Sequence, residues 1–157
     1  MDTALRLNSP GFVLWHATLR WQRAVTASLL PLRLTHVQFV LLAGVWWLTR
    51  NAGAPSQVDL AEHAGTDVKM TSQVVRKLEA RGLLTRTPDV IDSRIKRLAV
   101  TPEGVALARR AIKVVEAADR SCFSDLPDLD GLVAAMRTIA AGAQERVSSP
   151  TNRQPEE

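Results

Sequence analysis

The sequence predicts a mainly α-helical fold that carries one small β-ribbon. Two helical segments, at residues 58–64 and 70–81, are separated by a break at Gly65. Two strand-like runs follow them, at residues 83–87 and 95–101. Apolar side chains recur at helical spacing in the second segment, which supports its assignment. Helix, turn, helix and two-stranded ribbon, in this order, make up a winged helix-turn-helix.

The second helical segment has one continuous polar face. Val74, Val75 and Leu78 recur at the spacing of a buried stripe. The complementary positions carry amide, hydroxyl and cationic groups: Lys69, Ser72, Gln73 and Arg76. Such groups hydrogen-bond base edges and neutralise phosphates in the major groove of DNA. Taken alone, the face is more typical of an ordinary solvated helix, and the cationic ribbon behind it is what favours DNA binding.

Length and composition fit one compact unit. The chain has 157 residues, of which 46% are hydrophobic, and a formal net charge of +4. Eight Lys or Arg residues fall between Lys69 and Arg97, a local excess that suits a polyanionic partner. The N-terminus has no signal-peptide pattern, and the longest apolar run, Phe39 to Leu48, is too short to span a bilayer. We therefore expect a cytoplasmic protein with no membrane partner.

The residue types also exclude several other classes of protein. The single cysteine, Cys122, allows neither an internal disulfide nor a Cys-rich zinc site. The three histidines have no acidic or thiol neighbours at ligand spacing, so we expect no metal and no cofactor. No Ser-His-Asp set, glycine-rich phosphate loop or carboxylate pair stands out, and we therefore do not expect an enzyme.

Long helical segments flank the predicted DNA-binding unit. Residues 12–30 carry a broad apolar stripe, and residues 36–50 are apolar nearly all round, which places this helix at the centre of the domain. Two more helices, at residues 102 to about 122 and 129–147, follow the ribbon. The three outer helices carry more apolar surface than one copy of the chain covers, so we expect a homodimer.

Helix start signals support these boundaries. Ser9 and Pro10 suit the start of the first helix, and Thr35 is suited to cap the second. Ser56 with Asp59 resembles a capping box, and Thr101 precedes a proline at the start of the helix after the ribbon. The predicted organisation is a flexible N-terminus at residues 1–10, a helical dimerisation region formed by residues 11–34 with 102–147, a winged helix-turn-helix at residues 35–101, and a disordered tail at residues 148–157.

Several motifs resemble those of the MarR family of transcriptional regulators. They are Leu34-Thr-x-x-Gln38, Asp92-x-Arg94 and Val100-Thr101-x-x-Gly104, together with the segment Leu78 to Arg86, which is similar to the family's connection between recognition helix and ribbon. The order of helices and ribbon also agrees from about Phe12 to Val147. The resemblance implies an obligate dimer that represses genes from palindromic sites. Many members of the family are released from DNA by small, often aromatic, ligands.

The resemblance also assigns roles by position. It places Lys69 to Gln73 at the start of the recognition helix and Arg94 at the wing tip, where the arginine enters the minor groove. Two features depart from the family pattern, because Val100 stands in place of leucine and two apolar residues, Val90 and Ile91, lie in a wing that is normally polar. The predicted DNA-binding residues are Ser56, Lys69, Met70, Thr71, Ser72, Gln73, Arg76, Arg94 and Lys96.

The four tryptophans allow two interpretations. They either line an aromatic effector pocket between the first two long helices or belong to the hydrophobic core, and their residue type favours the core. In the first interpretation, a histidine or arginine supplies the polar group of the pocket. The effector-binding residues of that interpretation are Trp15, His16, Arg20, His36 and Trp47.

Two functions remain open from the sequence. One is a sequence-specific DNA-binding transcriptional regulator, expected to repress from palindromic operators, and the other is a winged-helix module that docks proteins without binding DNA. The polar face of residues 69–76 favours the regulator, because a docking helix shows more apolar or aromatic anchors. The expected partners are double-stranded DNA with an inverted repeat, a second copy of the chain and a small-molecule effector.

Overall fold

The chain divides into two compact units, Met1–Cys122 and Phe123–Glu157. The computed structural model describes residues 9–147, with side chains described for residues 9–141. The predicted disordered tail at residues 148–157, and most of the predicted flexible N-terminus at residues 1–10, lie outside the described residues.

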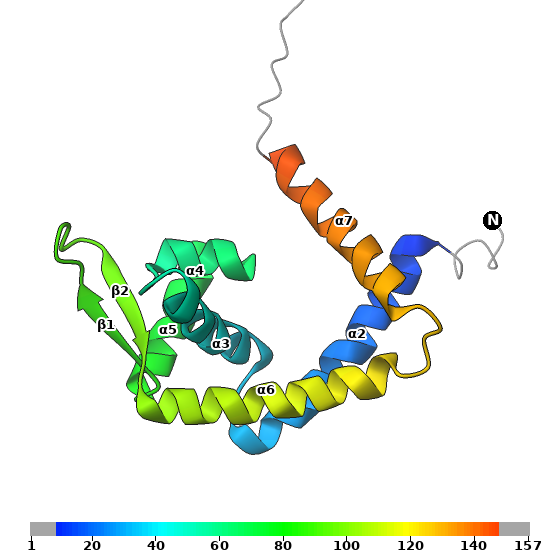
Figure 1. Cartoon of the computed structure of the whole chain (residues 1–157), viewed down its shortest axis with the longest axis horizontal. Helices are drawn as coiled ribbons and strands as arrows, with labels where there is room; N and C mark the ends of the chain where they lie inside the picture. Colours follow the sequence, from blue (N-terminus) through cyan, green and yellow to red (C-terminus); the bar gives the residue numbers. More distant parts are fainter. Residues whose placement is uncertain (1–8, 148–157) are drawn as a thin grey trace, which may run out of the picture. The chain divides into compact units, whose positions relative to one another are not determined.

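The predicted order of helices and ribbon is confirmed (Figure 1). The first unit contains a buried central helix, four further helices and one antiparallel ribbon among its described residues. The elements are α2 (Pro10–Leu29), the 3-10 turn η1 (Leu30–Leu32), α3 (His36–Asn51), α4 (Gln57–Ala64), α5 (Val68–Ala80), β1 (Leu84–Pro88), β2 (Lys96–Val100), α6 (Pro102–Phe123) and, in the second unit, α7 (Leu129–Val147).

Helices α3, α4 and α5 begin where side-chain caps satisfy free backbone donors of the first turn. Thr35 and Ser56 each form a complete capping box, with Gln38 and Asp59 as the reciprocal partners. Ser9 occupies the cap position of α2, but its side chain makes no capping hydrogen bond, so Pro10 at the first helical position supplies the start signal. The 3-10 turn carries the helical path past the predicted helix end at residue 30, through Pro31 to Leu32.

The central position predicted for α3 is confirmed. This helix packs against α2, α4, α5 and β2. Its residues Leu41, Leu42 and Val45 are fully buried, and Gly44 lets α4 approach closely, because a Cβ at this position would meet the side chain of Leu60 at 3.0 Å. One continuous core therefore joins α2, α3, the helix-turn-helix, the ribbon and α6.

The ribbon is a two-stranded antiparallel sheet. Leu84 pairs with Val100 at its base and Pro88 with Lys96 near its tip. Leu98 is buried toward the helices, and its backbone N–H donates to the carbonyl of Pro55 at 2.8 Å. This bond ties the second strand to the chain just before α4.

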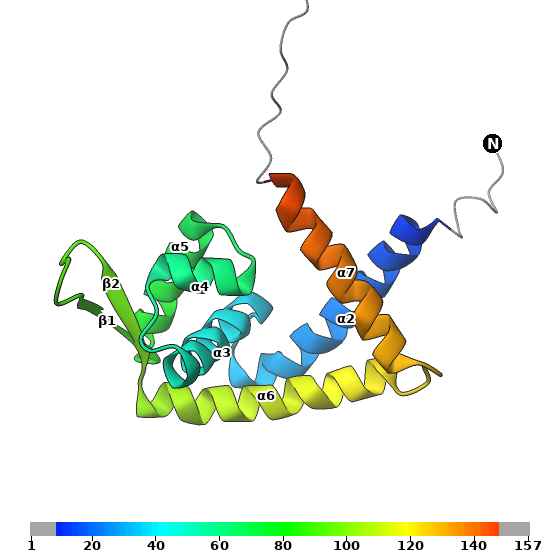
Figure 2. The same ribbon diagram turned by 45° about the horizontal axis from the view of Figure 1, so that its top comes forward.

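Helix α6 begins against the base of the ribbon and continues alongside α3 and α2, as Figures 1 and 2 both show. Trp21 of α2 donates its indole N–H to Asp119 of α6 at 2.7 Å. Arg109 of α6 lies over the ring of Trp46 of α3, with 5.6 Å between the guanidinium carbon and the ring centroid. These contacts place α2, α3 and α6 in one unit. The predicted boundary between a helical region and residues 35–101 therefore does not appear as a break in packing.

No single helix among the described residues is long and apolar enough to cross a membrane. Residues Pro10–Leu32 and His36–Asn51 reach that length and composition only as a pair, and the chain bends by 75° between them.

Candidate nucleic-acid interface

The polar face of α5 is accessible to solvent. Asp67 caps the helix by accepting a hydrogen bond from the backbone N–H of Met70 at 2.9 Å. Val75 and Leu78 are completely buried, which fixes the rotation of the helix about its axis. The opposite face presents three exposed side chains and one half-buried side chain: Lys69, Gln73 and Arg76 exposed, and Ser72 half-buried. The structure therefore brings the predicted amide, hydroxyl and cationic groups to one open face.

Thr71 does not belong to this face, and its predicted contact with DNA is wrong. Its side chain is completely buried. The Thr71 hydroxyl donates to the carbonyl of Asp67 at 2.8 Å and lies 2.8 Å from the hydroxyl of Thr66. The physical reason is helical spacing, because position 71 lies one turn before Val74 and Val75 and so shares their buried stripe. Thr71 positions the turn between the two helices.

Met70 and Ser56 occupy the edges of the same region. Met70 is 38% exposed in the first turn of α5. The half-buried Ser56 hydroxyl accepts the backbone N–H of Asp59 at 3.2 Å, which leaves the hydroxyl hydrogen free to donate. Both side chains remain accessible at the helix-turn-helix surface.

An ion pair fixes the ribbon to α5. Arg86 of β1 donates through Nε to a carboxylate oxygen of Glu79 of α5 at 2.7 Å, and its Nη2 lies 2.6 Å from the same oxygen. Both side chains are partly buried, so solvent screens the pair less than a fully exposed one. Glu79 is the only acidic residue within α5, and this ion pair neutralises its carboxylate.

A second set of contacts joins the ribbon to the start of α4. Arg97 of β2 donates through Nε to Asp89 at 2.6 Å, and its Nη1 lies 3.7 Å from Asp59. Ser56 and Arg97 also form an isolated antiparallel bridge. Strand alternation sends Lys96 outward, where it is exposed, and Arg97 inward. The two cations therefore face opposite sides of the ribbon.

The wing tip presents an oriented arginine. Arg94 binds the carboxylate of Asp92 with two side-chain donors, Nε at 3.0 Å and Nη2 at 2.9 Å. The Arg94 side chain is nevertheless 89% exposed. A bidentate pair restricts the orientation of the guanidinium while leaving it accessible to another anion. The Arg94 guanidinium is thus oriented by Asp92 and still accessible to another molecule.

The acidic residues of the wing stay ionised at low pH. The Arg97 guanidinium, and then the backbone N–H groups of Ile91 and Asp92, lower the pKa of Asp89 from 3.8 to about 2. The side-chain and then the backbone hydrogen bonds from Arg94 also lower the pKa of Asp92 below its ordinary value. Both carboxylates are therefore committed to arginines within the wing.

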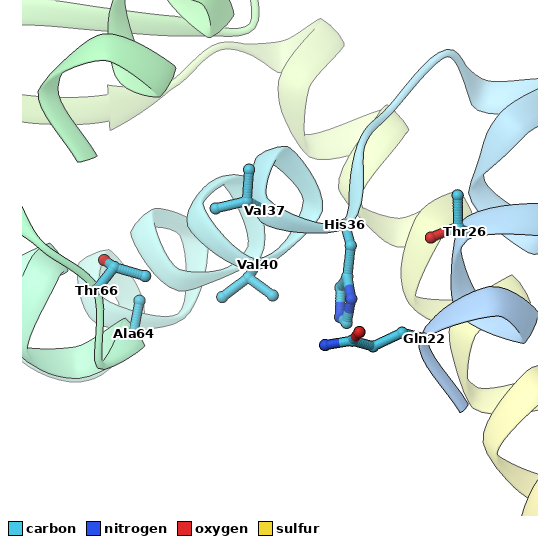
Figure 3. Close-up of a pocket in the computed structure, with 7 residues that line it drawn as sticks. All are labelled: Gln22, Thr26, His36, Val37, Val40, Ala64 and Thr66. Carbon is cyan, nitrogen blue, oxygen red and sulfur yellow. The ribbon is translucent and has the colours of Figure 1, made fainter. Parts of the chain in front are cut away.

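An open pocket of about 530 Å³ lies between α2, α3 and the end of α4. In Figure 3 the His36 and Gln22 side chains point to the same side of this pocket, whereas Ala64 and Thr66 border its other end. Burial lowers the pKa of His36, and the nearby Asp119 raises it by a smaller amount. The imidazole is therefore neutral at pH 7 and able to accept as well as donate a hydrogen bond. The lining residues are Gln22, Thr26, His36, Val37, Val40, Ala64 and Thr66.

Four of the five predicted effector residues do not line this pocket. Trp15 and His16 lie exposed near the start of α2, and Arg20 is also exposed. Trp47 stacks on His63, with 5.0 Å between the ring centroids. At the usual rise per residue, Trp47 lies roughly 16 Å along α3 from His36. The five residues therefore do not converge on one site. The core interpretation holds for Trp21 and Trp46, which pack on the core, and not for the exposed Trp15 and Trp47.

Two groups of residues that shape these sites were not predicted from the sequence. Gln22 and Thr26 are polar residues one turn apart in the first long helix, a spacing that was visible in the sequence. Asp89 directly follows a strand that ends in proline, and such a position favours a side chain that bonds the backbone of a turn. Within the described residues, no three His, Cys, Asp or Glu side chains lie close enough together to hold a metal ion.

Known proteins share this arrangement. The family model described as the MarR family matches residues 34–96. The HTH-type transcriptional regulator YdcH of Bacillus subtilis (strain 168) is 39% identical over 116 residues, which cover 74% of this chain and 79% of that protein. The HTH-type transcriptional repressor Rv2887 of Mycobacterium tuberculosis is 37% identical over 116 residues, covering 74% and 81%.

Solved structures agree with the sequence relatives. The transcriptional repressor CouR bound to a 23-mer DNA duplex superimposes with a TM-score of 0.75 at 26% identity, covering 91% of this chain and 98% of that one. CouR from Rhodococcus jostii RHA1 bound to p-coumaroyl-CoA gives a TM-score of 0.71 at 29% identity, covering 94% and 96%.

The chain belongs to the MarR family. It is a DNA-binding transcriptional regulator and not an enzyme, as the sequence predicted. The family assignment also decides between the two functions that the sequence left open, in favour of the regulator over the protein-docking module.

Proposed function

We propose that the protein is a repressor that binds an inverted-repeat operator as a homodimer and is released by a small aromatic ligand. The observation that carries the proposal is the exposed polar face of α5, together with a wing that ion pairs fix to α5 and α4. Relatives named as repressors support the direction of regulation. We also propose a cytoplasmic location, because a regulator of this kind must have access to the chromosomal DNA.

The proposed DNA contacts divide into two kinds. Gln73, with Ser72 and Met70, would contact base edges from the major groove, because amide and hydroxyl groups discriminate between bases. The cations and the Ser56 hydroxyl would contact phosphates or the minor groove, which fixes the register of the protein on the duplex. The second set is Ser56, Lys69, Arg76, Arg94 and Lys96.

Exposed apolar side chains support the homodimer. At the start of α2, Val13, Leu14 and Trp15 are 52%, 48% and 61% exposed. Within the second unit, Ile139 of α7 is 63% exposed. Large apolar side chains exposed in this way are typical of interfaces, and a twofold dimer would bury them. The proposed dimerisation region remains residues 11–34 with 102–147.

The pocket beside His36 supports a small-molecule effector. It combines apolar walls with a few polar groups, which is usual for ligand sites, and its volume suits a small aromatic compound. Residues of both α2 and the end of α4 line this pocket. A ligand there would contact the proposed dimerisation region and the helix-turn-helix together, and so would bias one arrangement of the two. CouR bound to p-coumaroyl-CoA is a relative with an aromatic ligand.

Selection of bound duplexes from a random pool tests the proposal directly. The full-length protein should enrich an inverted repeat whose half-sites lie about one helical turn, roughly 10 base pairs, apart. Binding should weaken steeply as salt rises, because phosphate contacts release counterions. Enrichment of no sequence, or of a single unrepeated site, would contradict the proposed mode of binding.

A pocket-filling variant tests the effector part separately. Val40→Trp would occupy the space beside His36 and leave the α5 surface unchanged. We expect the selected duplex to bind this variant normally, whereas p-coumarate and related aromatic acids that release the wild type would no longer act. Release of Val40→Trp by the same compounds at the same concentrations would place the effector site elsewhere.

A further inference from the structure

The wing tip exposes two large apolar side chains that the fold does not use. Val90 is 99% exposed and Ile91 is 94% exposed, more than any other large hydrophobic residue of the described chain. Single exposed apolar residues are common on protein surfaces. Two adjacent β-branched residues at the end of a projecting ribbon are a different feature, because neither contributes to the core.

The loop that carries them is held in one conformation. One carboxylate oxygen of Asp89 accepts the backbone N–H of Ile91 at 2.8 Å and that of Asp92 at 3.1 Å. Backbone bonds between Asp89 and Ile95, and between Ile95 and Asp92, close the loop at 2.9 Å each. Only 12% of the Asp89 side chain is exposed, and Arg97 anchors it from the second strand. The two apolar side chains are thus pre-organised, which reduces the entropy lost when they are buried against a partner.

The charges around the tip indicate what such a partner is. Arg94 and Lys96 are exposed beside the two apolar residues. The nearest carboxylates, Asp89 and Asp92, are both engaged by arginines. The tip is therefore an apolar surface flanked by an exposed lysine and by an exposed arginine whose ion pair lies within the wing. The DNA minor groove has the complementary chemistry, with deoxyribose walls, base edges at its floor and phosphates along both rims.

We propose that Val90 and Ile91 form an apolar wedge that enters the minor groove beside Arg94 and selects a deformable base step there. The inference rests on the proposed DNA-binding function and extends it to bases outside the major-groove half-site. Apolar side chains that enter the minor groove partly unstack a base step, and pyrimidine–purine steps unstack most easily. The wedge would therefore add a preference for sequence at positions that α5 does not contact.

The test compares two double variants on the duplex that the wild type selects from a random pool. Val90→Ser with Ile91→Ser removes the apolar surface, whereas Val90→Ile with Ile91→Val keeps it and serves as the matched control. We expect the serine variant to bind roughly tenfold or more weakly, since it loses the burial of two apolar side chains. Its salt dependence should equal that of the wild type, because no ionic contact is lost. The control should bind like the wild type.

Repeating the selection with the serine variant gives a second measurement. The half-site should persist, and the preference for a pyrimidine–purine step at its outer flank should disappear. Equal affinity and equal flanking preference would overturn the wedge and leave the tip free for a protein partner. A weaker salt dependence in the serine variant would also overturn it, because the tip would then act only by positioning Arg94. If the wild type selects no duplex at all, the proposed function fails first and the wedge fails with it.

Discussion

Arg97 donates a 2.6 Å hydrogen bond to Asp89 and so joins the second strand of the ribbon to the first residue of the wing loop. Asp89 in turn accepts two backbone N–H groups of the loop. The same arginine reaches Asp59 and the carbonyl of Ala54, next to α4. One side chain therefore determines both the conformation of the wing tip and its attachment to the helix-turn-helix.

The wing should lose its structure on acidification, in a defined pH range. The pKa of Asp89 is about 2 in the folded chain, against an ordinary value of 3.8. A lowered carboxyl pKa means that its stabilisation is fully present above pH 3.8 and is lost as the pH falls toward 2. An NMR titration of the Asp89 carboxyl should show this midpoint. Faster amide exchange at Ile91 and Asp92 should accompany it.

Arg97→Ala should raise the titration midpoint of Asp89 toward 3.8, because the first cause of its depression is removed. The same variant should bind operator DNA more weakly although Arg97 faces inward. Lys96→Ala is the matched control for the titration, since Lys96 is exposed at the neighbouring position of the strand. It should leave the Asp89 titration unchanged. A midpoint near 2 in Arg97→Ala would show that the backbone donors alone hold the carboxylate.

The α5 face should separate base contacts from phosphate contacts. Gln73→Ala should cost roughly 1–3 kcal/mol of operator binding and relax the base preference at one position of each half-site. Arg76→Ala should weaken binding to all sequences alike and reduce the salt slope by about one. Fluorescence anisotropy with the selected duplex and with single-base variants measures both effects. An unchanged base preference in Gln73→Ala would mean that another part of the face contacts the bases.

Most of the fold followed from the sequence because its signals were local. The capping boxes at Thr35 and Ser56 and the all-apolar helix α3 each depend on residues within a few positions of one another. The alternation of Lys96 and Arg97 was predictable for the same reason. Thr71 was wrongly assigned because its residue type was given more weight than its helical spacing to Val74, Val75 and Leu78.

The pocket and the wing conformation depend on contacts between distant residues, and here the sequence was insufficient. The effector set was chosen by residue type, and the aromatic side chains instead found separate partners, such as Trp47 with His63. Arg97 meets Asp59, 38 positions earlier, only after the ribbon has folded back on α4. Neither pairing has a periodic signal in the sequence. Periodicity predicts which face of an element is buried but not which residue lies opposite.

Trp15→Glu should shift the protein from dimer toward monomer. Trp15 is 61% exposed near the start of α2, so the change leaves the core of a single chain intact. Burial of a carboxylate in an apolar interface is strongly unfavourable. Sedimentation velocity at micromolar concentration should show the change in mass, and Val90→Glu, at an equally exposed apolar position of the wing, should remain a dimer. A wild type that sediments as a stable monomer would refute the homodimer itself.

Gly104→Ala should destabilise the fold. A Cβ at Gly104 would overlap the backbone carbonyl of Leu83 and the side chain of Val100, where α6 begins against the ribbon. Backbone cannot move aside cheaply, so we expect the free energy of unfolding to fall by roughly 1–3 kcal/mol. Gly11→Ala is the control, since nothing lies within 4 Å of the added methyl group. It should be neutral or slightly stabilising in a helix. Urea denaturation of both variants measures the difference.

Arg94→Ala should remove a DNA contact without affecting the folded dimer. The Arg94 side chain is 89% exposed, and its ion pair with Asp92 is a surface pair that adds little to stability. The thermal unfolding midpoint and the sedimentation coefficient should therefore match the wild type. Operator affinity should fall roughly tenfold or more with a smaller salt slope, because a cation placed in the electronegative minor groove is lost. Arg94→Lys should recover the salt slope but only part of the affinity, since lysine cannot form the bidentate pair with Asp92 that orients the guanidinium. If Arg94→Ala binds the operator like the wild type, the ion pair is only a surface feature and α5 alone recognises the DNA.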